Sequence, residues 1–363
     1  MPKLTREVLE RYLTAVFGRS ISVVEIVPLG ETVQPKSIKT YGYGTPVRID
    51  YQVAGETDRR SAVFHTARPS PFGREHMADR AQAILWAHQA FRNLPRHAPS
   101  LDVGAFRPDG SLFSLGQVDE FCQLTEYVEG AGYSLDLERL RDSDQMTDLD
   151  QERADALCDY LVDIHSTRSS QQGLYVRRVR ELVGHGECIM GLIDSYPEHP
   201  LIPTAMLQKI EHLCIDWRWR LKPLVHRLRQ VHGDFHPWNI LFGSGSNFHV
   251  LDRSRGEWGD PADDVTCLTA NFLFFALQRY GRLAGPLEGL FLRFWQRYLD
   301  ASRDSEMLRV VAPYFAFRGL VMASPAWYPS LPDAVRQKLL NFVVTVLKIE
   351  EFNPGEVNEY CNG

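Results

Sequence analysis

The chain has 363 residues, of which 44% are hydrophobic and 24% are charged, proportions that are ordinary for a folded globular protein and exclude extensive disorder. Its net charge of −6 argues against a general nucleic-acid-binding surface, which would need a basic excess. The six cysteines are dispersed, the first ten residues carry no apolar run, and the longest apolar stretch, residues 265–277, is too short to span a bilayer. We therefore expect a cytoplasmic protein without a secretory signal or membrane contact.

The N-terminal part is predicted to contain a helix, three strands and a second helix. Apolar residues recur at helical spacing over residues 5–17, with Thr5 as the N-cap and Gly18 as the stop. A polar loop, residues 30–44, separates the first strand from the second, and the second helix is expected over residues 72–92. Segments rich in β-branched residues predict the strands over 21–29, 47–54 and 61–66.

The rest of the chain is predicted to change from strands to helices. Strands are expected over residues 101–106 and 121–130, and residues 135–151 are expected to form a surface loop and a short helix. Together these patterns predict a sheet-bearing domain over residues 1–130 and a mainly helical domain over 131–363. The helices of the second domain are predicted over 153–165, 177–193, 205–229, 269–279, 287–298, 308–322 and 334–349.

The candidate catalytic residues lie in a short polar stretch of the helical domain. Asp234 and Asn239 stand five residues apart on a predicted loop, and Asp252 follows after a predicted hairpin. Phosphoryl transfer needs a pair of oxygen ligands for a metal ion and a group that orients the attacking hydroxyl, because the transferred group is already highly charged. Asp234 is therefore the candidate base or hydroxyl-orienting group. Asn239 and Asp252 are the candidate ligands of Mg²⁺, which prefers hard oxygen donors.

At these residues the chain resembles the aminoglycoside phosphotransferase and choline kinase family, whose catalytic loop reads His, Gly, Asp, x, His, x, x, Asn, as residues 232–239 do here. The resemblance implies an α+β, two-lobed, protein-kinase-like fold with a small antiparallel sheet in the N-terminal lobe. It also implies that His232 and Asp264 support the loop without touching substrate. Arg253 departs from the family, which usually has an aromatic residue there. A second shared signature precedes Asp264 and consists of Gly259, Asp260 and Pro261.

The resemblance places the nucleotide site in the N-terminal lobe, where the chain departs further from the family. The family's third strand supplies a lysine to the phosphates, but the third predicted strand here carries His65. With an ordinary pKa of about 6.5, a histidine is a poor permanent cation at pH 7. We hypothesise that Lys39 supplies the charge from the preceding loop, and a solvated loop lysine is the alternative. Glu75 and Asp79 are both candidates for the acidic partner of this cation.

The segment 121–130 resembles the family's inter-lobe hinge, whose backbone groups hold the purine. Glu126 and Val128 are the residues that we expect to make those backbone contacts. A plain strand end before Gly130 is the alternative.

Several other residues have two interpretations. His232 and His236 resemble a metal-binding pair, but two histidines four apart outside a helix, with no third ligand nearby, favour a structural role over zinc. His165 is expected to form hydrogen bonds in the core. The acidic tail, residues 350–363, is either a contact for a cationic acceptor or a solvated end. Two interpretations are also open for four aromatic residues: they either pack in the core or form a cage for a quaternary ammonium group. These residues are Tyr280, Trp295, Trp327 and Tyr328.

We therefore expect an ATP- or GTP-dependent, Mg²⁺-requiring kinase that phosphorylates a hydroxyl of a small molecule. The expected partners are a nucleotide and an aminoglycoside-like, choline-like or sugar-like acceptor, with neither nucleic acid nor membrane. A nucleotide-binding pseudokinase is an alternative, because His65 replaces the lysine. Transfer of a nucleotidyl group is a second alternative. The sequence indicates neither the acceptor nor the oligomeric state.

Overall fold

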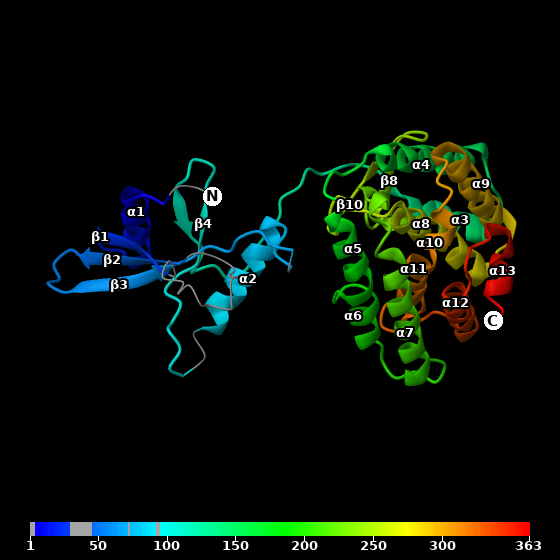
Figure 1. Ribbon diagram of the computed structural model, residues 1–363. Helices are drawn as coiled ribbons and strands as arrows, with labels where there is room; N and C mark the ends of the chain where they lie inside the picture. Colours follow the sequence, from blue (N-terminus) through cyan, green and yellow to red (C-terminus); the bar gives the residue numbers. More distant parts are fainter. Residues whose placement is uncertain (1–3, 30–45, 72, 92–94) are drawn as a thin grey trace. The chain divides into compact units, whose positions relative to one another are not determined.

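The computed structural model describes residues 4–29, 46–71, 73–91 and 95–363. Contacts between residues divide the chain into two compact units, Met1–Thr125 and Glu126–Gly363 (Figure 1). The first carries a small antiparallel sheet and the second is mainly helical, which confirms the predicted α+β fold class. The boundary between the units lies close to the predicted domain boundary at residue 130.

The N-terminal unit begins with the predicted helix α1, Arg6–Phe17. The Thr5 side chain accepts a hydrogen bond from the backbone of Val8, and Gly18 ends the helix in the left-handed conformation that glycine adopts without strain. The three predicted strands follow as β1 (Ile21–Pro28), β2 (Val47–Val53) and β3 (Arg59–Phe64), paired antiparallel in the order β1-β2-β3. The helix packs on this sheet, and their shared core consists of Leu9, Tyr12, Leu13, Ile21, Val23, Ile49, Tyr51 and Val53.

The second half of this unit differs from the prediction in two places. Helix α2, Met77–Ala90, begins five residues later than expected, because Pro69, Pro71 and Gly73 disfavour helix before it. A hairpin follows, formed by β4 (Gly104–Phe106) and β5 (Leu112–Ser114). The strand predicted over 121–130 is wrong. These residues form no backbone ladder, and Leu124 is 99% exposed, so an apolar pattern without a partner strand did not produce a strand.

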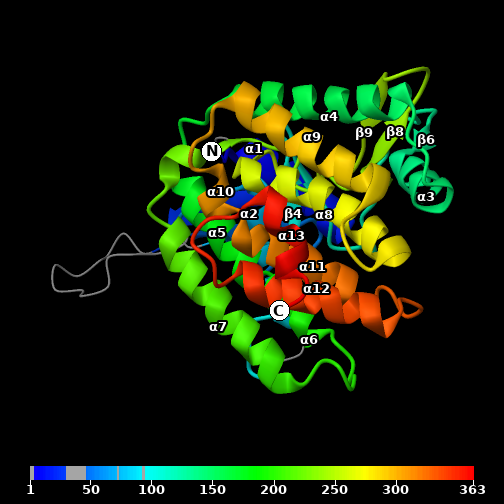
Figure 2. The same cartoon turned by 90° about the vertical axis from the view of Figure 1, so that its right-hand side faces the viewer.

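The C-terminal unit is built around one buried helix, α8 (Pro261–Tyr280). Every residue from 265 to 277 is buried, as expected for the longest apolar stretch of the chain. Figure 2 shows α4 and α9 side by side, and Arg297 on α9 pairs with Asp159 on α4 at 2.7 Å. The remaining helices are α3 (Tyr133–Ser143), α4 (Asp148–Ser166), α5 (Gly173–Gly184), α6 (Ile189–Asp194), α7 (Thr204–Leu221), α9 (Gly285–Ser302), α10 (Met307–Val310), α11 (Ala312–Ala323), α12 (Asp333–Val346) and α13 (Val357–Tyr360).

Several predictions for the helical unit need correction, including the helix predicted over 205–229, which ends at Leu221. The short helix expected within residues 135–151 is α3, which already begins at Tyr133, and only residues 144–147 remain outside helices before α4. The helix expected over 177–193 is two helices, α5 and α6, separated by a turn that contains Gly186. The acidic tail is folded, because Phe352 and Tyr360 are buried and pack against each other. Its side chains Glu350 and Glu351 form surface ion pairs with Arg220 and Arg309.

Short strands in this unit position the loop that carries the candidate catalytic residues. The predicted hairpin is present as β8 (Ile240–Phe242) and β9 (Phe248–Val250), and β6 (Ala131–Gly132) pairs with the other edge of β8. A second pair joins β7 (Arg229–Gln230) to β10 (Trp258–Gly259). Residues 231–239 connect β7 to β8, so both ends of this loop are held by hydrogen-bonded strands. Across the described part of the chain, the helices are too short or too polar to cross a membrane.

Candidate active site

The loop at residues 232–239 is held in shape by its own backbone. The His236 amide donates to the Asp234 carbonyl at 2.9 Å, and the Asn239 amide donates to the His236 carbonyl at 2.9 Å. Gly233 has a φ of 87°, a conformation that side chains disfavour, and a Cβ there would lie 3.3 Å from the Cβ of Arg255. The loop therefore turns sharply just before Asp234.

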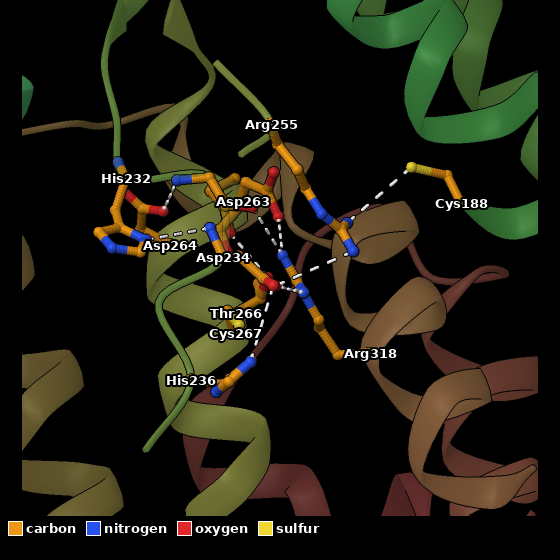
Figure 3. Close-up of polar contacts among 12 residues, drawn as sticks. Cys188, His232, Asp234, His236, Arg255, Asp263, Asp264, Thr266, Cys267 and Arg318 are labelled. Carbon is orange, nitrogen blue, oxygen red and sulfur yellow. Dashed lines mark hydrogen bonds and ion pairs between the residues drawn. The ribbon is translucent and has the colours of Figure 1, made fainter. Parts of the chain in front are cut away.

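Asp264, in the first turn of α8, binds the backbone of this loop (Figure 3). Its two carboxylate oxygens accept hydrogen bonds from the backbone amides of His232 and Gly233, both at 2.7 Å. The His165 ring bonds Asp264 at 3.1 Å and the Tyr298 hydroxyl at 2.7 Å. Burial alone would raise the pKa of Asp264, but these hydrogen bonds and the neighbouring histidines hold it below its ordinary value. Asp264 is fully buried and positions the loop through its backbone.

Asp234 points into a cluster of cationic side chains (Figure 3). The Arg318 guanidinium, from α11, donates to the Asp234 carboxylate at 2.5 Å and to the Asp263 carboxylate at 2.6 Å. Arg255 lies 4.0 Å and His236 3.7 Å from the Asp234 carboxylate. Burial would raise the pKa of Asp234, but the charge of Arg318, followed by those of Arg255 and His236, keeps it below its ordinary value. Asp234 is therefore ionised at neutral pH.

Asn239 and Asp252 are brought together by the β8–β9 hairpin. Ile240 pairs with Val250, and the Leu251 amide donates to the Asn239 carbonyl at 2.8 Å, so Asp252 directly follows a residue bonded to Asn239. The Asn239 side-chain amide donates to the Asp234 carbonyl at 3.1 Å. This bond uses the nitrogen of the Asn239 amide and leaves its oxygen available as a ligand.

Asp252 has the backbone and surroundings expected of a ligand-binding residue. Its φ is 55°, which is uncommon for a residue other than glycine but tolerated by aspartate. Its carboxylate is exposed and accepts only one bond, from the Ser254 amide at 3.3 Å, among the residues that the structure describes. The Asn239 and Asp252 oxygens are donors of the hard type that suits Mg²⁺, and substrate phosphates would supply the remaining ligands. The donor set therefore fits the expected ion.

The two histidines of the loop differ in environment. His232 is buried, its Nδ1 accepts a bond from the Asp234 amide at 3.3 Å, and its ring edge contacts Phe235. Burial lowers the pKa of His236, although the nearby Asp234 charge opposes this effect. His236 is therefore mostly neutral at pH 7. In the described ranges 4–29, 46–71, 73–91 and 95–363, no group of three His, Cys, Asp or Glu side chains is arranged to hold a metal ion.

The predicted nucleotide-binding residues of the N-terminal unit are not brought together in the described residues. His65 is exposed just after the end of β3, and it lines a pocket of about 330 Å³ with Arg74, Ile84 and Phe91 of the α2 region. Lys39 lies outside the described residues. Of the two acidic candidates, Asp79 caps the start of α2 by accepting from the His76 amide at 2.7 Å, and Glu75 precedes the helix.

The predicted hinge residues lie at the start of the second unit. Glu126 is exposed and Val128 is partly buried, in a segment without a strand. The candidate aromatic cage is not formed by Trp295, which is 1% exposed and packs against Phe315 and Phe352 in the core. The Tyr280 hydroxyl donates to the Asp144 carboxylate at 2.5 Å.

Three residues at the site were missed by the sequence reasoning. Arg318 and Asp263 form the buried ion pair beside Asp234, and Arg255 flanks it. A signal for Arg318 was present, because it is the single charged residue of α11, whose other residues are apolar or small. A charge in a wholly buried helix needs a partner of opposite sign, and this argument predicts a buried carboxylate nearby. Arg253 also has a role, since its guanidinium donates twice to the Val231 carbonyl, at 2.9 and 2.8 Å.

Comparisons with solved structures find several similar kinases and phosphotransferases. Among solved structures, the chain is similar to the amicoumacin kinase hAmiN in complex with AMP-PNP, Ca²⁺ and Ami, at 14% identity and a TM-score of 0.43, covering 89% of this chain and 92% of that one. It is also similar to the choline kinase LicA from Streptococcus pneumoniae, at 11% identity and a TM-score of 0.37, covering 94% and 98%. For the aminoglycoside phosphotransferase APH(2'')-Ib with ADP bound, the identity is 12%, the TM-score 0.33 and the coverage 96% and 100%.

The sequence comparisons bear on the family itself. No curated protein sequence matches the chain. The profile of the phosphotransferase enzyme family matches residues 49–306, which include the catalytic loop, the hairpin and the start of α8. The predicted family resemblance is thereby confirmed, and the chain belongs to the phosphotransferase enzyme family.

Proposed function

We propose that the chain transfers the γ-phosphoryl group of ATP or GTP to a hydroxyl group of a small molecule. One observation carries this proposal: the Asn239 side chain bonds the Asp234 carbonyl at 3.1 Å, and its backbone bonds the residue before Asp252 at 2.8 Å. An ionised carboxylate and two oxygen donors for a cation are thus gathered at one junction of loop and hairpin. Phosphoryl transfer depends mainly on such positioning and on charge.

Asp234 would orient the acceptor hydroxyl and take its proton. The hydroxyl oxygen forms a bond to the γ-phosphorus, the bond from that phosphorus to the bridging oxygen breaks, and the nucleoside diphosphate leaves. Because its pKa is held below the ordinary value, Asp234 is a weak base, and it receives the proton only as the new bond forms. Asp264 and Arg318 keep the loop and its carboxylate in place through the bonds described above.

Asn239 and Asp252 are the residues that would hold Mg²⁺. When bound, the ion would neutralise charge on the nucleotide phosphates and fix their position. In the N-terminal unit, Lys39 and His65 would contact the phosphates, and the backbone of Glu126 and Val128 would contact the base. The hinge contacts of Glu126 and Val128 follow from the family resemblance, whereas Lys39 is our hypothesis for the charge that the family's missing lysine would supply, and His65 stands at that lysine's position.

A nucleotide-binding protein without transferase activity is the competing proposal. The observation that favours it is His65, an exposed histidine at the position where the family has a lysine. Against it, the ordered bonds around Asp234 have no purpose in a protein that only binds nucleotide. Transfer of a nucleotidyl group could use the same residues. The product would then be heavier by a nucleoside monophosphate group, and not by a phosphoryl group.

Thermal unfolding of the wild type and Asp252→Asn with Mg²⁺ plus ATP, and separately with Mg²⁺ plus GTP, tests the site. A ligand at a hundred times its dissociation constant adds about 2.7 kcal/mol to the free energy of unfolding. We expect a metal-dependent shift in the wild type that Asp252→Asn loses. Asp148→Asn is the matched control, since Asp148 is an exposed aspartate at the start of α4. Equal shifts in all three proteins would reject this metal site.

Turnover separates the two proposals. Mass spectrometry of a mixed hydroxyl-compound panel after incubation with Mg²⁺ and nucleotide should reveal addition of a phosphoryl group, and Asp234→Ala should abolish it while the thermal shift persists. Full activity in Asp234→Ala would exclude the proposed role. A shift without any product would favour the nucleotide-binding protein, and addition of a nucleoside monophosphate would identify nucleotidyl transfer.

A further inference from the structure

Arg255 presents an unusually placed guanidinium beside the catalytic carboxylate. It lies on the loop that follows Asp252, and its side chain extends past Asp234 toward Cys188 (Figure 3). One face of the guanidinium covers the Phe317 ring at 4.8 Å, and one edge lies 4.0 Å from the Asp234 carboxylate. The side chain is 20% exposed. The group is therefore fixed against an aromatic ring, partly withdrawn from water, with an edge facing the reacting position.

The hydrogen-bond donors of Arg255 are poorly used. A guanidinium carries five N–H donors. Over residues 4–29, 46–71, 73–91 and 95–363, the contact recorded for them within bonding distance is the weak acceptor Cys188 Sγ, at 3.9 Å. Leaving donors unpaired in a half-buried site is unfavourable. A ligand that supplied acceptor oxygens would remove this cost.

The neighbouring carboxylates are already committed to other arginines. Arg318 binds both Asp234 and Asp263, and Arg178 binds Glu181 at 2.8 Å. Arg178 belongs to the same surroundings, because a Cβ on Gly256 would lie 3.9 Å from its guanidinium. Among the described residues, Arg255 is thus left with one long contact, 4.0 Å, to a carboxylate that Arg318 already binds at 2.5 Å. A cationic ligand group at this edge would meet positive charge, whereas an anionic group would be attracted.

We infer that the acceptor carries a carboxylate or phosphate group a few bonds from its reactive hydroxyl, and that Arg255 binds this anionic group. A planar guanidinium fixed by stacking matches the two oxygens of a carboxylate or phosphate in a bidentate contact. Because the Arg255 guanidinium lies 4.0 Å from the Asp234 carboxylate, an anion bound to it would hold the hydroxyl beside Asp234. This inference rests on the proposed phosphoryl transfer and narrows it, since it favours acidic acceptors over aminoglycoside-like and choline-like cations.

The test compares acceptors that differ by one anionic group. We would measure kcat/KM with Mg²⁺ and ATP for serine against ethanolamine, glucuronate against glucose, and glycerol 3-phosphate against glycerol, so that carboxylate and phosphate are distinguished. The proteins are the wild type, Arg255→Gln, Arg255→Glu and the control Arg282→Gln, which removes an exposed arginine between α8 and α9. Thermal shifts with inorganic phosphate, at constant ionic strength with Mg²⁺ and ADP present, add a readout that needs no turnover.

The expected result is selectivity that depends on Arg255. The wild type and Arg282→Gln should prefer the acidic member of a pair by at least about tenfold, the scale expected when a charge-assisted bond is lost. Arg255→Gln should remove this ratio together with the phosphate-induced shift, and Arg255→Glu should invert it. Preference of the wild type for cationic members would overturn the inference. So would a loss in Arg255→Gln that is equal for both members of each pair, because Arg255 would then act on the transferred phosphoryl group.

The inference and the proposed function fail in different ways. Transfer of phosphate to neutral or cationic acceptors, with a phosphate shift that Arg255→Gln retains, rejects the inference and leaves the kinase activity standing. Absence of transfer to every acceptor, despite a nucleotide-dependent shift, rejects the proposed function and the acceptor inference with it. The unfolding temperatures of the Arg255 variants without ligand show whether these proteins are folded like the wild type.

Discussion

Three aspartates at the start of α8, the N-cap and two in the first turn, have different roles, and their partners decide which role each takes. Asp260 caps the helix. Its carboxylate accepts hydrogen bonds from Arg227 Nε at 2.8 Å, from Arg227 Nη2 at 2.9 Å and from the Tyr175 hydroxyl at 2.7 Å. Asp263 binds Arg318, and Asp264 binds the catalytic loop. Burial raises the pKa of Asp263. Burial would also raise the pKa of Asp260, but the charge and hydrogen bonds of Arg227, together with the bonds from the Ala262 amide and the Tyr175 hydroxyl, hold it below its ordinary value. The pKa values of two chemically identical side chains, three residues apart, are therefore shifted in opposite directions.

Replacing Arg318 should change the pH dependence of catalysis. In the wild type the pKa of Asp234 lies below its ordinary value of 3.8, so its carboxylate stays ionised down to that pH. In Arg318→Gln, burial would no longer be opposed by the main neighbouring charge, and the pKa of Asp234 would rise. We therefore expect the acid limb of the kcat profile to move to higher pH. The measurement is kcat from pH 4 to 8, with a compound from the hydroxyl panel that the wild type phosphorylates.

Two controls accompany this prediction. Loss of a partner from a buried ion pair costs on the order of 3 kcal/mol, so the free energy of unfolding must be measured for Arg318→Gln. Arg318→Lys keeps the positive charge and should keep the acid limb near its wild-type position even if activity falls. An unchanged pH profile in Arg318→Gln, in a protein that is still folded, would contradict the assigned electrostatic role.

At the level of the elements, close packing between α11 and α12 leaves no room for a side chain at Gly319. A Cβ at this position would lie 2.5 Å from Val343 Cγ2, and Val343 is fully buried. Alanine in place of glycine stabilises a helix interior by about 1 kcal/mol. Overpacking a close-packed core costs about 1–3 kcal/mol. The clash should exceed the gain in helix propensity here.

We predict that Gly319→Ala lowers the free energy of unfolding by about 1 kcal/mol, measured by urea denaturation. Gly289→Ala on α9 is the matched control, because its Cβ would meet Met146 Cε at an ordinary 3.7 Å. That variant should be unchanged or more stable. Val343→Ala combined with Gly319→Ala should recover part of the loss. If both glycine variants were stabilised, the packing of α11 on α12 would be looser than described.

At the level of the whole molecule, the chain joins two separately packed units through an exposed segment. The residues on either side of the division between Thr125 and Glu126 include Leu124 and Tyr127, with exposed fractions of 99% and 85%. Large apolar side chains at these values are favourable sites for a protease, since the backbone around them forms no ladder. They also belong to the segment proposed to hold the nucleotide base.

Limited chymotrypsin digestion should therefore cut first between Phe121 and Tyr127 and release two fragments that divide near residue 125. If the backbone of Glu126 and Val128 binds the base, Mg²⁺ with ATP should slow this cut, whereas Mg²⁺ alone should not. Cleavage after the exposed Trp327 serves as the internal control, because it lies far along the chain from the segment. A first cut elsewhere would contradict the exposure of the segment, and a rate indifferent to nucleotide would contradict the base contact.

The sequence by itself determined the features that depend on local pattern. The caps of α1, the β8–β9 hairpin and the buried stretch of α8 follow from turn chemistry and hydrophobic periodicity, which act over a few residues. The spacing of Asp234, Asn239 and Asp252 was equally local, since one loop and one hairpin carry all three residues. The family followed from the same motifs.

Only the tertiary structure decided the interactions between residues distant in sequence. Arg318 reaches Asp234 across 84 positions, and His165 reaches Asp264 across 99. Such pairs depend on how α11 and α4 pack around α8, which no local pattern encodes. The same reason explains why the strand predicted over 121–130 is absent. An apolar pattern becomes a strand only when another strand pairs with it, and these residues have no such partner in the described part of the chain. Charge balance at the site, and with it the inference about the acceptor, became visible only once these side chains were placed together.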